Sequence, residues 1–252
     1  MSFRVVIPAR HASTRLPGKA LLEIAGRPLL AHVCDRAMES GAEQIIVATD
    51  DSRIESAARD CGVRAVMTAA THVSGTDRIA EVVGRLGWPD DTLVVNLQGD
   101  EPLVPPAVIR QLAALLVNAP GAALATLSTP LRSLAEFLDP NVVKIVTDER
   151  GAALYFSRAP VPWPRDQVDG RGRPSGFAHA QRHLGLYAYR VATLRRLAAL
   201  PECEAERIER LEQLRALWHG LEIRVAVAEE VPEAGVDTAE DLARVRARLE
   251  AG

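Results

Sequence analysis

The sequence predicts a doubly wound, Rossmann-like α/β fold, in which helices cover both faces of a mostly parallel central sheet. Through the first half of the chain, short runs of β-branched residues alternate with segments of helical periodicity. The run Leu93-Val94-Val95 is apolar at every position, as expected of a strand that helices cover on both sides. Ligands of such sheets bind at the carboxyl ends of the strands, so the loops that follow strands should hold the functional site.

The predicted elements of the first half follow one another regularly. β-branched and apolar residues predict strands at residues 4–7, 44–48, 64–67, 92–97 and 123–127. Apolar residues that recur with the helical period predict helices at residues 29–38, 52–60, 77–86 and 107–117. Each strand except the last is followed by a helix, which is the order of repeated βαβ units.

The second half breaks this rhythm. Residues 158–182 contain four prolines and three glycines and show neither period, which predicts a long loop of the kind that is often functional. Beyond it we expect strands at 184–190 and 222–228 and helices at 191–200, 204–219 and 239–249. Since no repeat or linker composition appears, we expect a single domain, residues 1–252, with a protruding region.

Composition excludes several classes of protein. The chain has 252 residues, 48% of them hydrophobic, which is enough for a full core. A net charge of -3 argues against a general nucleic-acid binder. The three cysteines show no CxxC spacing, which predicts neither a disulfide framework nor a Cys-rich zinc site. Every apolar run is too short for a signal peptide or a membrane span, so we expect a cytoplasmic protein without membrane insertion.

Three positive charges crowd the loop after the first strand. In IPARHASTRLPGKAL, residues 7–21, these are Arg10, Arg15 and Lys19. The loop matches neither GxxxxGK[ST] nor GxGxxG, so side-chain charge would hold a polyphosphate there and stabilise a leaving pyrophosphate. Only two of the 30 basic residues are Lys, which favours a specific role for the compact charge of Lys19. The alternative is an ordinary surface loop with three solvated cations.

Two acidic stretches are candidates for a metal site. In VVNLQGDEP, residues 94–102, Asp100 follows an apolar strand, and Mg²⁺ is usually held by one or two carboxylates together with substrate phosphates. In GVDTAEDL, residues 235–242, Asp237 would be a second carboxylate. Ordinary turn chemistry could explain Asp100, and Thr238 with Asp241 resembles a capping box of the last helix.

The stretch THVSGTDRIAEV, residues 71–82, places Ser74, Gly75 and Thr76 just ahead of a helix. Free N–H groups and small hydroxyls at such a position can contact a base or a phosphate. A simple helix cap is the competing interpretation, and for VATDD, residues 47–51, we favour capping outright.

In the second half, three polar residues stand out without any spacing that links them: Arg158, His183 and Glu212. Taken alone, each is more often structural than functional. In the helix predicted at 204–219, Glu212 lies beside an expected apolar stripe formed by Ile208, Leu211, Leu214 and Trp218. Tyr187 and Tyr189 alternate along a strand, which is typical of packing or interface residues.

Seven motifs together carry a resemblance to a known family. They are, in order, IPAR-x-x-STRLPGK, SGTDR, NLQGDEP, LYFSR, RHLGLYAY, LEQLR and GVDTAEDL. From residue 5 to about residue 248, the chain resembles the 3-deoxy-manno-octulosonate (Kdo) cytidylyltransferases, the CMP-Kdo synthetases of Gram-negative lipopolysaccharide biosynthesis. The resemblance implies a nucleotidyltransferase fold and a cytoplasmic homodimer, with residues 155–200 as its dimerisation and sugar-side region.

The resemblance also implies a role for individual residues. It places the nucleotide CTP against Pro8, Ala9, Arg10, Arg15, Lys19, Ser74, Gly75, Thr76 and Arg78. It places the Kdo sugar against Gln98, Arg158, His183, Tyr187 and Glu212. It implies Mg²⁺ as the cofactor, held by Asp100 and Asp237, and it makes Lys19, Asp100 and Arg10 the catalytic residues.

The mechanism implied is attack of the anomeric hydroxyl of Kdo on the α-phosphorus of CTP, giving CMP-Kdo and diphosphate without a covalent enzyme intermediate. Two alternatives stay open at this point. A related cytidylyltransferase could use another acidic sugar, such as 8-amino-Kdo or a sialic acid. A non-catalytic nucleotide-sensing module could share the fold, although such a protein should lack one of the acids or cations named above.

Overall fold

The computed structural model describes residues 1–12, 16–72 and 74–250. The chain divides into two compact units: Met1–Ala114, Ala188–Ala198 and Glu229–Gly252 form unit 1, and Leu115–Tyr187 and Ala199–Ala228 form unit 2. The region predicted to protrude, 155–200, is shared between the two units. A single domain over 1–252 remains a prediction.

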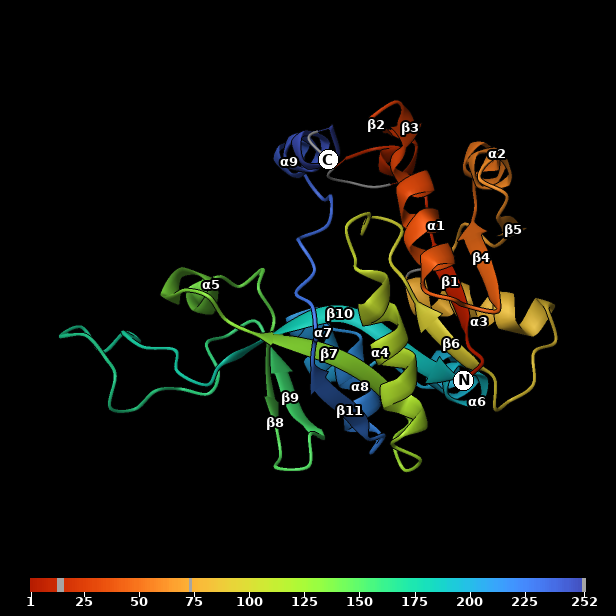
Figure 1. Ribbon diagram of the computed structural model, residues 1–252. Coiled ribbons are helices and arrows are strands. Elements are labelled where there is room, and N and C mark those ends of the chain that lie inside the picture. Colours follow the sequence, from red (N-terminus) through yellow and green to blue (C-terminus); the bar gives the residue numbers. More distant parts are fainter. Residues whose placement is uncertain (13–15, 73, 251–252) are drawn as a thin grey trace. The chain divides into compact units, whose positions relative to one another are not determined.

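Unit 1 is built on a parallel sheet with the strand order β6-β1-β4-β5 (Figure 1). The first strand of the chain pairs in parallel with the strands on both of its sides, as a doubly wound fold requires. The strands are β1 (Arg4–Pro8), β4 (Gln44–Thr49), β5 (Arg64–Met67) and β6 (Leu93–Asn96). All four fall within a residue or two of the strands that the sequence predicts.

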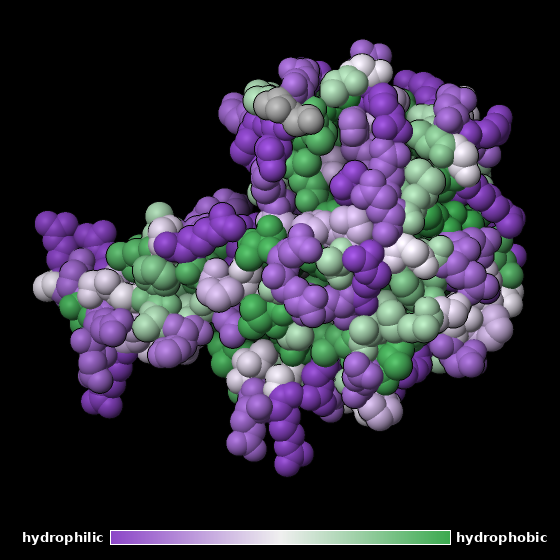
Figure 2. All heavy atoms as spheres, in the orientation of Figure 1, coloured by the Kyte–Doolittle hydropathy of each residue, from purple (hydrophilic) through white to green (hydrophobic). Residues whose placement is uncertain are grey.

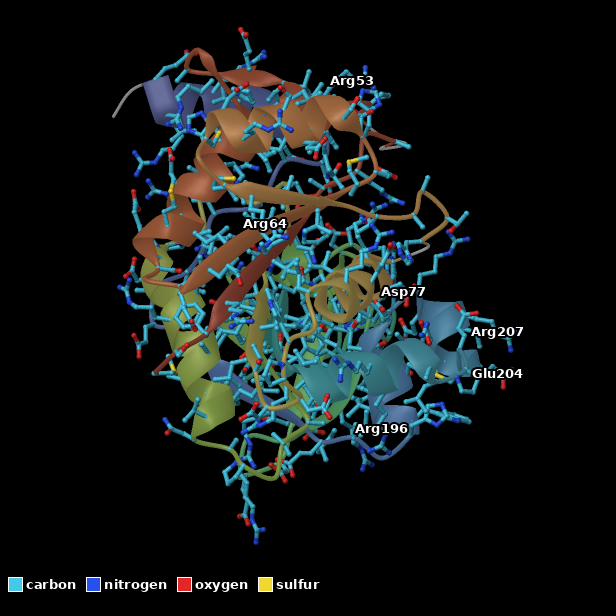
Figure 3. All side chains as sticks on the ribbon, turned by 90° about the vertical axis from the view of Figure 1, so that its right-hand side faces the viewer. Arg53, Arg64, Asp77, Arg196, Glu204 and Arg207 are labelled. Carbon is cyan, nitrogen blue, oxygen red and sulfur yellow. The ribbon has the colours of Figure 1, made fainter. Side chains whose placement is uncertain are left out.

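Helices cover both faces of this sheet, with α1 on one face and α3 on the other (Figures 1 and 3). The helices of unit 1 are α1 (Leu29–Glu39), α2 (Ser52–Asp60), α3 (Gly75–Arg85), α6 (Val191–Ala199) and α9 (Ala239–Glu250), and α4 (Pro106–Val117) leads from it into unit 2. The prediction of a mostly parallel sheet covered on both faces is confirmed. The sequence did not predict the one-turn 3-10 helix η1 (Lys19–Leu21) or the small hairpin of β2 (Glu23–Ile24) and β3 (Arg27–Pro28).

Local caps determine where several helices begin. Asp51 accepts the backbone N–H of Arg53 at the start of α2, where Arg53 is seen in Figure 3. Thr238 and Asp241 form the predicted capping box of α9, each accepting the other's backbone N–H, at 3.1 and 3.2 Å. The cap interpretations of both stretches are therefore confirmed.

Unit 2 combines parallel and antiparallel pairs of strands. β7 pairs in parallel with β11, while β8 pairs antiparallel with both β9 and β10. The elements are β7 (Leu124–Pro130), α5 (Leu134–Leu138), β8 (Lys144–Thr147), β9 (Ala153–Ser157), α7 (Glu204–Glu209), α8 (Gln213–Trp218) and β11 (Ile223–Val227), with β10 (Gln181–Arg190) leading into unit 1. The sequence predicted neither α5 nor the β8–β9 pair.

One prediction for this unit is wrong. Residues 204–219 form two short helices, because Arg210 adopts a left-handed conformation with φ 52° between them. The expected apolar stripe is broken accordingly: Leu211 and Leu214 are buried, whereas Ile208 and Trp218 are 74% and 64% exposed.

The long loop predicted at 158–182 is present over residues 158–180, where the one β-pairing is an isolated bridge between Val168 and Pro174. Figure 2 shows a largely hydrophilic surface at the outer end of this loop and hydrophobic residues near α5. There Phe177 packs against a small buried cluster of Leu131, Phe137 and Ala180. Among the described residues, none of the helices has the length and apolar character that crossing a bilayer would require.

Candidate active site

Three of the predicted site residues meet in unit 1. The Lys19 ammonium donates to Asp100 Oδ2, to Asp237 Oδ1 at 3.0 Å and to the Val236 carbonyl at 3.2 Å. The Lys19 side chain is 17% exposed, whereas those of Asp100 and Asp237 are 26% and 44% exposed, so the ammonium is the most buried group of a partly solvent-exposed cluster. The sequence separates these residues by up to 218 positions, yet the fold brings a basic loop and two acidic loops to one point.

Lys19 reaches this point from η1, which follows a tight turn. Gly18 stands at φ 67° ahead of the helix, a conformation that favours glycine, and its N–H donates to the His11 carbonyl at 3.0 Å. Residues 13–15 lie between these two, so the predicted phosphate ligand Arg15 falls outside the described residues.

Asp100 is positioned by a close approach between the loops after β1 and β6. A Cβ atom on Gly99 would lie 2.9 Å from the Pro8 carbonyl oxygen and 3.2 Å from the Ala9 Cβ atom. Any residue with a Cβ atom at position 99 would force Pro8 or Ala9 to move, so this close approach of the two loops requires glycine. The loop that carries Asp100 therefore lies directly against Pro8 and Ala9, two of the predicted nucleotide-binding residues.

Asp237 is positioned by a second close approach. The Val236 N–H donates to the Asp100 carbonyl at 2.8 Å, and a Cβ atom on Gly235 would lie 2.7 Å from that same carbonyl oxygen. The Asp237 side chain takes no part in the capping box of α9, which Thr238 and Asp241 complete. The Asp237 carboxylate instead accepts a hydrogen bond from the Lys19 ammonium.

Replacing Gly235 with Ala should separate Asp237 from Asp100. The added methyl group would collide with backbone and with the Glu101 Cδ atom at 2.9 Å, so we expect a loss of about 1–3 kcal/mol in the free energy of unfolding. Urea denaturation measures it. Gly121→Ala is the matched control, because a Cβ there meets nothing within 4 Å. Equal stability of the two variants would contradict the close approach.

The electrostatics of the cluster keep Lys19 charged. Burial lowers the pKa of its ammonium, but the charges and hydrogen bonds of Asp100 and Asp237 outweigh this, and the pKa lies above its ordinary value. The Lys19 ammonium is thus a cation bound by the carboxylates of Asp100 and Asp237 and by the Val236 carbonyl.

The same oxygen atoms fit a magnesium ion by their chemistry. Mg²⁺ prefers hard oxygen ligands and is usually bound by one or two carboxylates, with substrate phosphates and water completing its shell. Within the part of the chain that the structure describes, no group of three or more His, Cys, Asp or Glu side chains is gathered for a metal. A metal at Asp100 and Asp237 would complete its shell with water or with the oxygens of a bound phosphate.

Pro8 and the start of α3, which are among the described residues predicted to contact the nucleotide, lie at the same edge of the sheet. Pro8 ends β1, Ala9 is buried, and Arg10 is exposed in the loop that follows. A Cβ atom on Gly75 would lie 3.4 Å from Pro8 Cγ, which places the start of α3 against the end of β1. Ser74 caps α3 by accepting the N–H of Asp77 at 3.1 Å, and Asp77 is seen in Figure 3.

Arg78 is buried and held by two partners that the sequence did not indicate. Its guanidinium donates to Thr68 Oγ1 at 2.5 Å and to Asp50 Oδ2 at 3.0 Å, and its side chain is 3% exposed. Thr68 in turn donates to the Thr49 carbonyl at 3.0 Å. Arg78 therefore fixes the beginning of α3 to the ends of β4 and β5, while a direct contact with a nucleotide stays a prediction.

Of the residues predicted on the sugar side, Gln98 belongs to unit 1 and the other four to unit 2. The Gln98 side chain donates to Asn96 Oδ1 at 3.3 Å. In unit 2, Arg158 donates from Nε to the Glu209 carbonyl at 2.6 Å and from Nη1 to the Pro140 carbonyl at 2.9 Å. Glu209, which sequence analysis missed, also accepts from the Ser157 hydroxyl and the Arg158 N–H, so it anchors the start of the long loop.

His183 and Tyr187 are packed together in the core of unit 2. The His183 ring lies 4.9 Å from Phe156 and 5.3 Å from Tyr187, measured between ring centroids, and its Nε2 is 2.9 Å from Thr126 Oγ1. Burial, followed by the nearby charge of Arg182, lowers the pKa of His183 to about 3. The imidazole is therefore neutral at physiological pH, and it takes part in hydrogen bonding without carrying a charge.

This buried histidine predicts a pH-dependent stability. Its pKa is lower in the folded than in the unfolded chain, so between about pH 6.5 and the folded pKa the unfolded chain binds more protons. The contribution of His183 to the free energy of unfolding is fully present above pH 6.5. It decreases as the pH falls toward the folded pKa, by up to about 1.4 kcal/mol per pH unit. His183→Gln should flatten the acid slope of the free energy of unfolding, measured by urea denaturation. His179→Asn, a substitution at an exposed histidine, should leave this slope unchanged. Equal slopes of the free energy of unfolding against pH in the two variants would refute the assignment of the pH dependence to His183.

Glu212 lies half-buried at the start of α8, where its carbonyl accepts the N–H of Arg215 at 3.0 Å. It stands one residue after Leu211, on the segment that follows the left-handed turn at Arg210. The helical pattern of the sequence did not indicate this turn.

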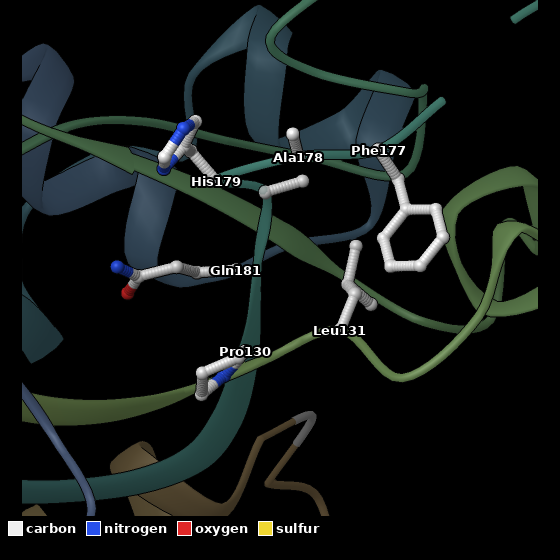
Figure 4. A pocket seen from close by; sticks show the side chains of 7 residues that line it. Pro130, Leu131, Phe177, Ala178, His179 and Gln181 are labelled. Atoms are coloured by element: carbon white, nitrogen blue, oxygen red, sulfur yellow. The ribbon is translucent and has the colours of Figure 1, made fainter. Parts of the chain in front are cut away.

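Unit 2 also contains a cavity of about 340 Å³ beside the start of β10 (Figure 4). Its walls are mostly apolar, with polar groups from His179 and Gln181, and the Gln181 side chain accepts the Ser128 hydroxyl at 2.5 Å. Its lining residues 177–181 belong to the predicted sugar-side region, but the five individual residues predicted to contact the sugar are not among those that line it.

Comparisons with known proteins show the family of this chain. A family model described as cytidylyltransferase matches residues 4–223. A 3-deoxy-manno-octulosonate cytidylyltransferase of Halorhodospira halophila is 55% identical over 250 residues, 99% of this chain and 97% of the relative. The chain belongs to the 3-deoxy-manno-octulosonate cytidylyltransferase family. A further member, from Thioalkalivibrio sulfidiphilus, is 53% identical and is matched over the full length of both chains.

A solved structure of this family supports the fold over its whole length. The structure of CMP:2-keto-3-deoxy-manno-octonic acid synthetase complexed with CTP has a TM-score of 0.90 and 40% identity, and the match covers 100% of this chain and 99% of that one. A nucleotidyl transferase from Methanothermobacter thermautotroptrophicus, at 17% identity and a TM-score of 0.66, shares the fold. The predicted family and nucleotidyltransferase fold are therefore confirmed.

Proposed function

We propose that this protein transfers CMP from CTP to 3-deoxy-manno-octulosonate, giving CMP-Kdo and diphosphate for lipopolysaccharide biosynthesis. The observation that carries the proposal is the meeting of Lys19, Asp100 and Asp237 at the carboxyl edge of the sheet of unit 1. It occurs in a chain more than 50% identical, over nearly its full length, to 3-deoxy-manno-octulosonate cytidylyltransferases.

In this proposal Asp100 and Asp237 hold Mg²⁺ together with the phosphates of CTP. When bound there, the ion would lower the pKa of the attacking anomeric hydroxyl of Kdo and screen the charge of the α-phosphate. The support is the donor set itself, two carboxylates and the Val236 carbonyl around one cation position.

The basic residues of the first loop would act on the leaving diphosphate. Arg10 is exposed at the end of β1 and free to reach a phosphate, and Lys19 lies beside the metal-binding carboxylates. Together with Arg15 they would neutralise the charge that develops as the bond to the α-phosphorus breaks. The N–H groups at the start of α3, with Ser74, Gly75 and Thr76, would hold the rest of the nucleotide.

On the sugar side, Arg158 would pair with the carboxylate of Kdo, and Gln98, His183, Tyr187 and Glu212 would contact its hydroxyl groups. The neutral state of His183 supports a role in hydrogen bonding and not in charge pairing. Arg158 now binds backbone carbonyls of Glu209 and Pro140, so pairing with a carboxylate would use its remaining donors or replace one of these contacts.

We further propose that the protein is a cytoplasmic homodimer formed through residues 155–200. Exposed Tyr155 and Trp163, at 41% and 54%, support an interface in this region. The three cysteines are free thiols, which is compatible with a reducing compartment.

A diphosphate-release assay tests the reaction. The purified protein with Mg²⁺ is given each of the four nucleoside triphosphates with Kdo, and CTP with 8-amino-Kdo or a sialic acid. We expect release with CTP and Kdo and little with the other combinations. Turnover of CTP with a sialic acid but not with Kdo would place the protein among cytidylyltransferases of a different sugar, and release from no combination would reject the function.

A further inference from the structure

The Lys19 ammonium occupies the position between Asp100 and Asp237 that the proposed function gives to a metal. We infer that Lys19 is an internal cation that keeps these two carboxylates from binding a divalent metal until a triphosphate draws the ammonium away. The inference rests on the proposed function in one respect, since it takes Asp100 and Asp237 as the metal ligands.

The contacts of the ammonium leave it no free donor. An ammonium has three N–H donors, and Lys19 has three oxygen acceptors: Asp100 Oδ2, Asp237 Oδ1 and the Val236 carbonyl. To bind a phosphate oxygen, Lys19 must give up at least one of them. A metal that bound the same carboxylate oxygens would have to displace the ammonium from them.

The positive charge of Lys19 also opposes metal binding. Asp100 and Asp237 with Lys19 carry a net charge of about one negative unit, whereas without Lys19 they carry two. A divalent cation therefore meets both weaker attraction and direct repulsion while the ammonium is in place. The tail of CTP changes this balance, because its phosphates offer the ammonium new anionic partners and offer the metal new ligands.

The local structure allows the ammonium to move. Lys carries its charge on a flexible four-carbon chain, and here that chain begins in the single turn of η1, directly after Gly18. Lys144, the other lysine, shows the contrasting case. Its ammonium is fully buried and donates to the carbonyls of Asp139, Val142 and Arg158, with no carboxylate within its hydrogen bonds. Of the two lysines, Lys19 is the one whose ammonium is bound by carboxylates, the side chains that most often hold Mg²⁺.

A purely structural ion pair would behave in the opposite way. If Lys19 only held residues 235–237 against Asp100, its removal would let the two carboxylates drift apart and weaken metal binding. The two interpretations thus predict changes of opposite sign in the same measurement.

The test is the binding of Mn²⁺, a spectroscopic substitute for Mg²⁺, followed by electron paramagnetic resonance. The full-length wild type, Lys19→Met and Lys19→Gln are titrated without CTP and without Kdo. We expect both variants to bind Mn²⁺ about 10-fold more tightly than the wild type, within the usual range of coupling between two sites. Adding Asp100→Asn to either variant should abolish the gain. Arg27→Gln is the matched control, because it removes an equal charge from the exposed pair with Asp35 and should leave Mn²⁺ binding unchanged.

The outcomes separate this inference from the proposed function. Unchanged or weaker Mn²⁺ binding in both Lys19 variants would overturn the inference. If Asp100→Asn still weakened Mn²⁺ binding to the wild type in the presence of CTP, the proposed metal site would stand despite that result. If Asp100→Asn had no effect on Mn²⁺ binding even with CTP, the metal assignment and the inference would both fail. Two substitutions at Lys19 are used so that a folding defect of one leaves the other to decide.

Discussion

The Asp100→Asn variant is expected to lose about two orders of magnitude or more in kcat while remaining folded. Asp100 and Asp237 are the two carboxylates that accept hydrogen bonds from Lys19 in the described part of the chain, and they form the proposed metal position. Asn keeps the shape of the side chain but removes its negative charge. The proposed metal and the Lys19 ammonium would then both lose the carboxylate of Asp100 as a partner. Steady-state diphosphate release measures the effect.

The stability of this variant should be close to that of the wild type, because the polar Asp100 side chain is 26% exposed and Asn keeps its shape. Circular dichroism and a thermal melt provide the control. Near-normal turnover of a folded Asp100→Asn protein would exclude Asp100 as a metal ligand.

The Lys19→Arg variant should be impaired about 10-fold or more even though it keeps the positive charge. The Lys19 ammonium fits as a point charge among three oxygen atoms that belong to two different loops. A planar guanidinium is wider and would pair with one carboxylate in its preferred two-pronged geometry, which leaves the other unpaired and blocks the metal position.

The matched control for this variant is Arg27→Lys, the reverse exchange at the exposed pair with Asp35, which should leave kcat unchanged. Normal activity of Lys19→Arg would mean that any cation suffices at residue 19. The preference for Lys in a chain otherwise rich in Arg would then have no mechanistic basis.

Patterns that repeat along the chain predicted most of the fold. The parallel strands of unit 1 could be predicted because each is a short apolar run next to an amphipathic helix, and α2 and β5 lie at the predicted residues. The capping box of Thr238 and Asp241 could be predicted because capping depends on residues three positions apart.

Features that depend on contacts between distant residues could not be predicted in this way. Thr68 and Asp50 hold Arg78 from 10 and 28 positions away, and Glu209 anchors Arg158 from 51 positions away. The break between α7 and α8 arises at an arginine in a left-handed conformation, which sequence patterns assign to glycine or asparagine.

The sequence predicts the candidate site as a set of residues and not as an arrangement in space. Position after a strand indicated Lys19 and Asp100, and the capping box accounted for Asp237 less completely than for Thr238 and Asp241. That Lys19 itself lies between the two carboxylates could not follow from spacing, because it depends on the close approaches at Gly99 and Gly235.

The central claim is that this protein joins CMP to Kdo with the help of Asp100. Mass spectrometry of a reaction with CTP, Kdo and Mg²⁺, run together with a diphosphate assay, tests it most directly. The account predicts CMP-Kdo and diphosphate in equal amounts with the wild type and neither with Asp100→Asn. Diphosphate without CMP-Kdo, or equal formation of CMP-Kdo by the two proteins, would contradict it.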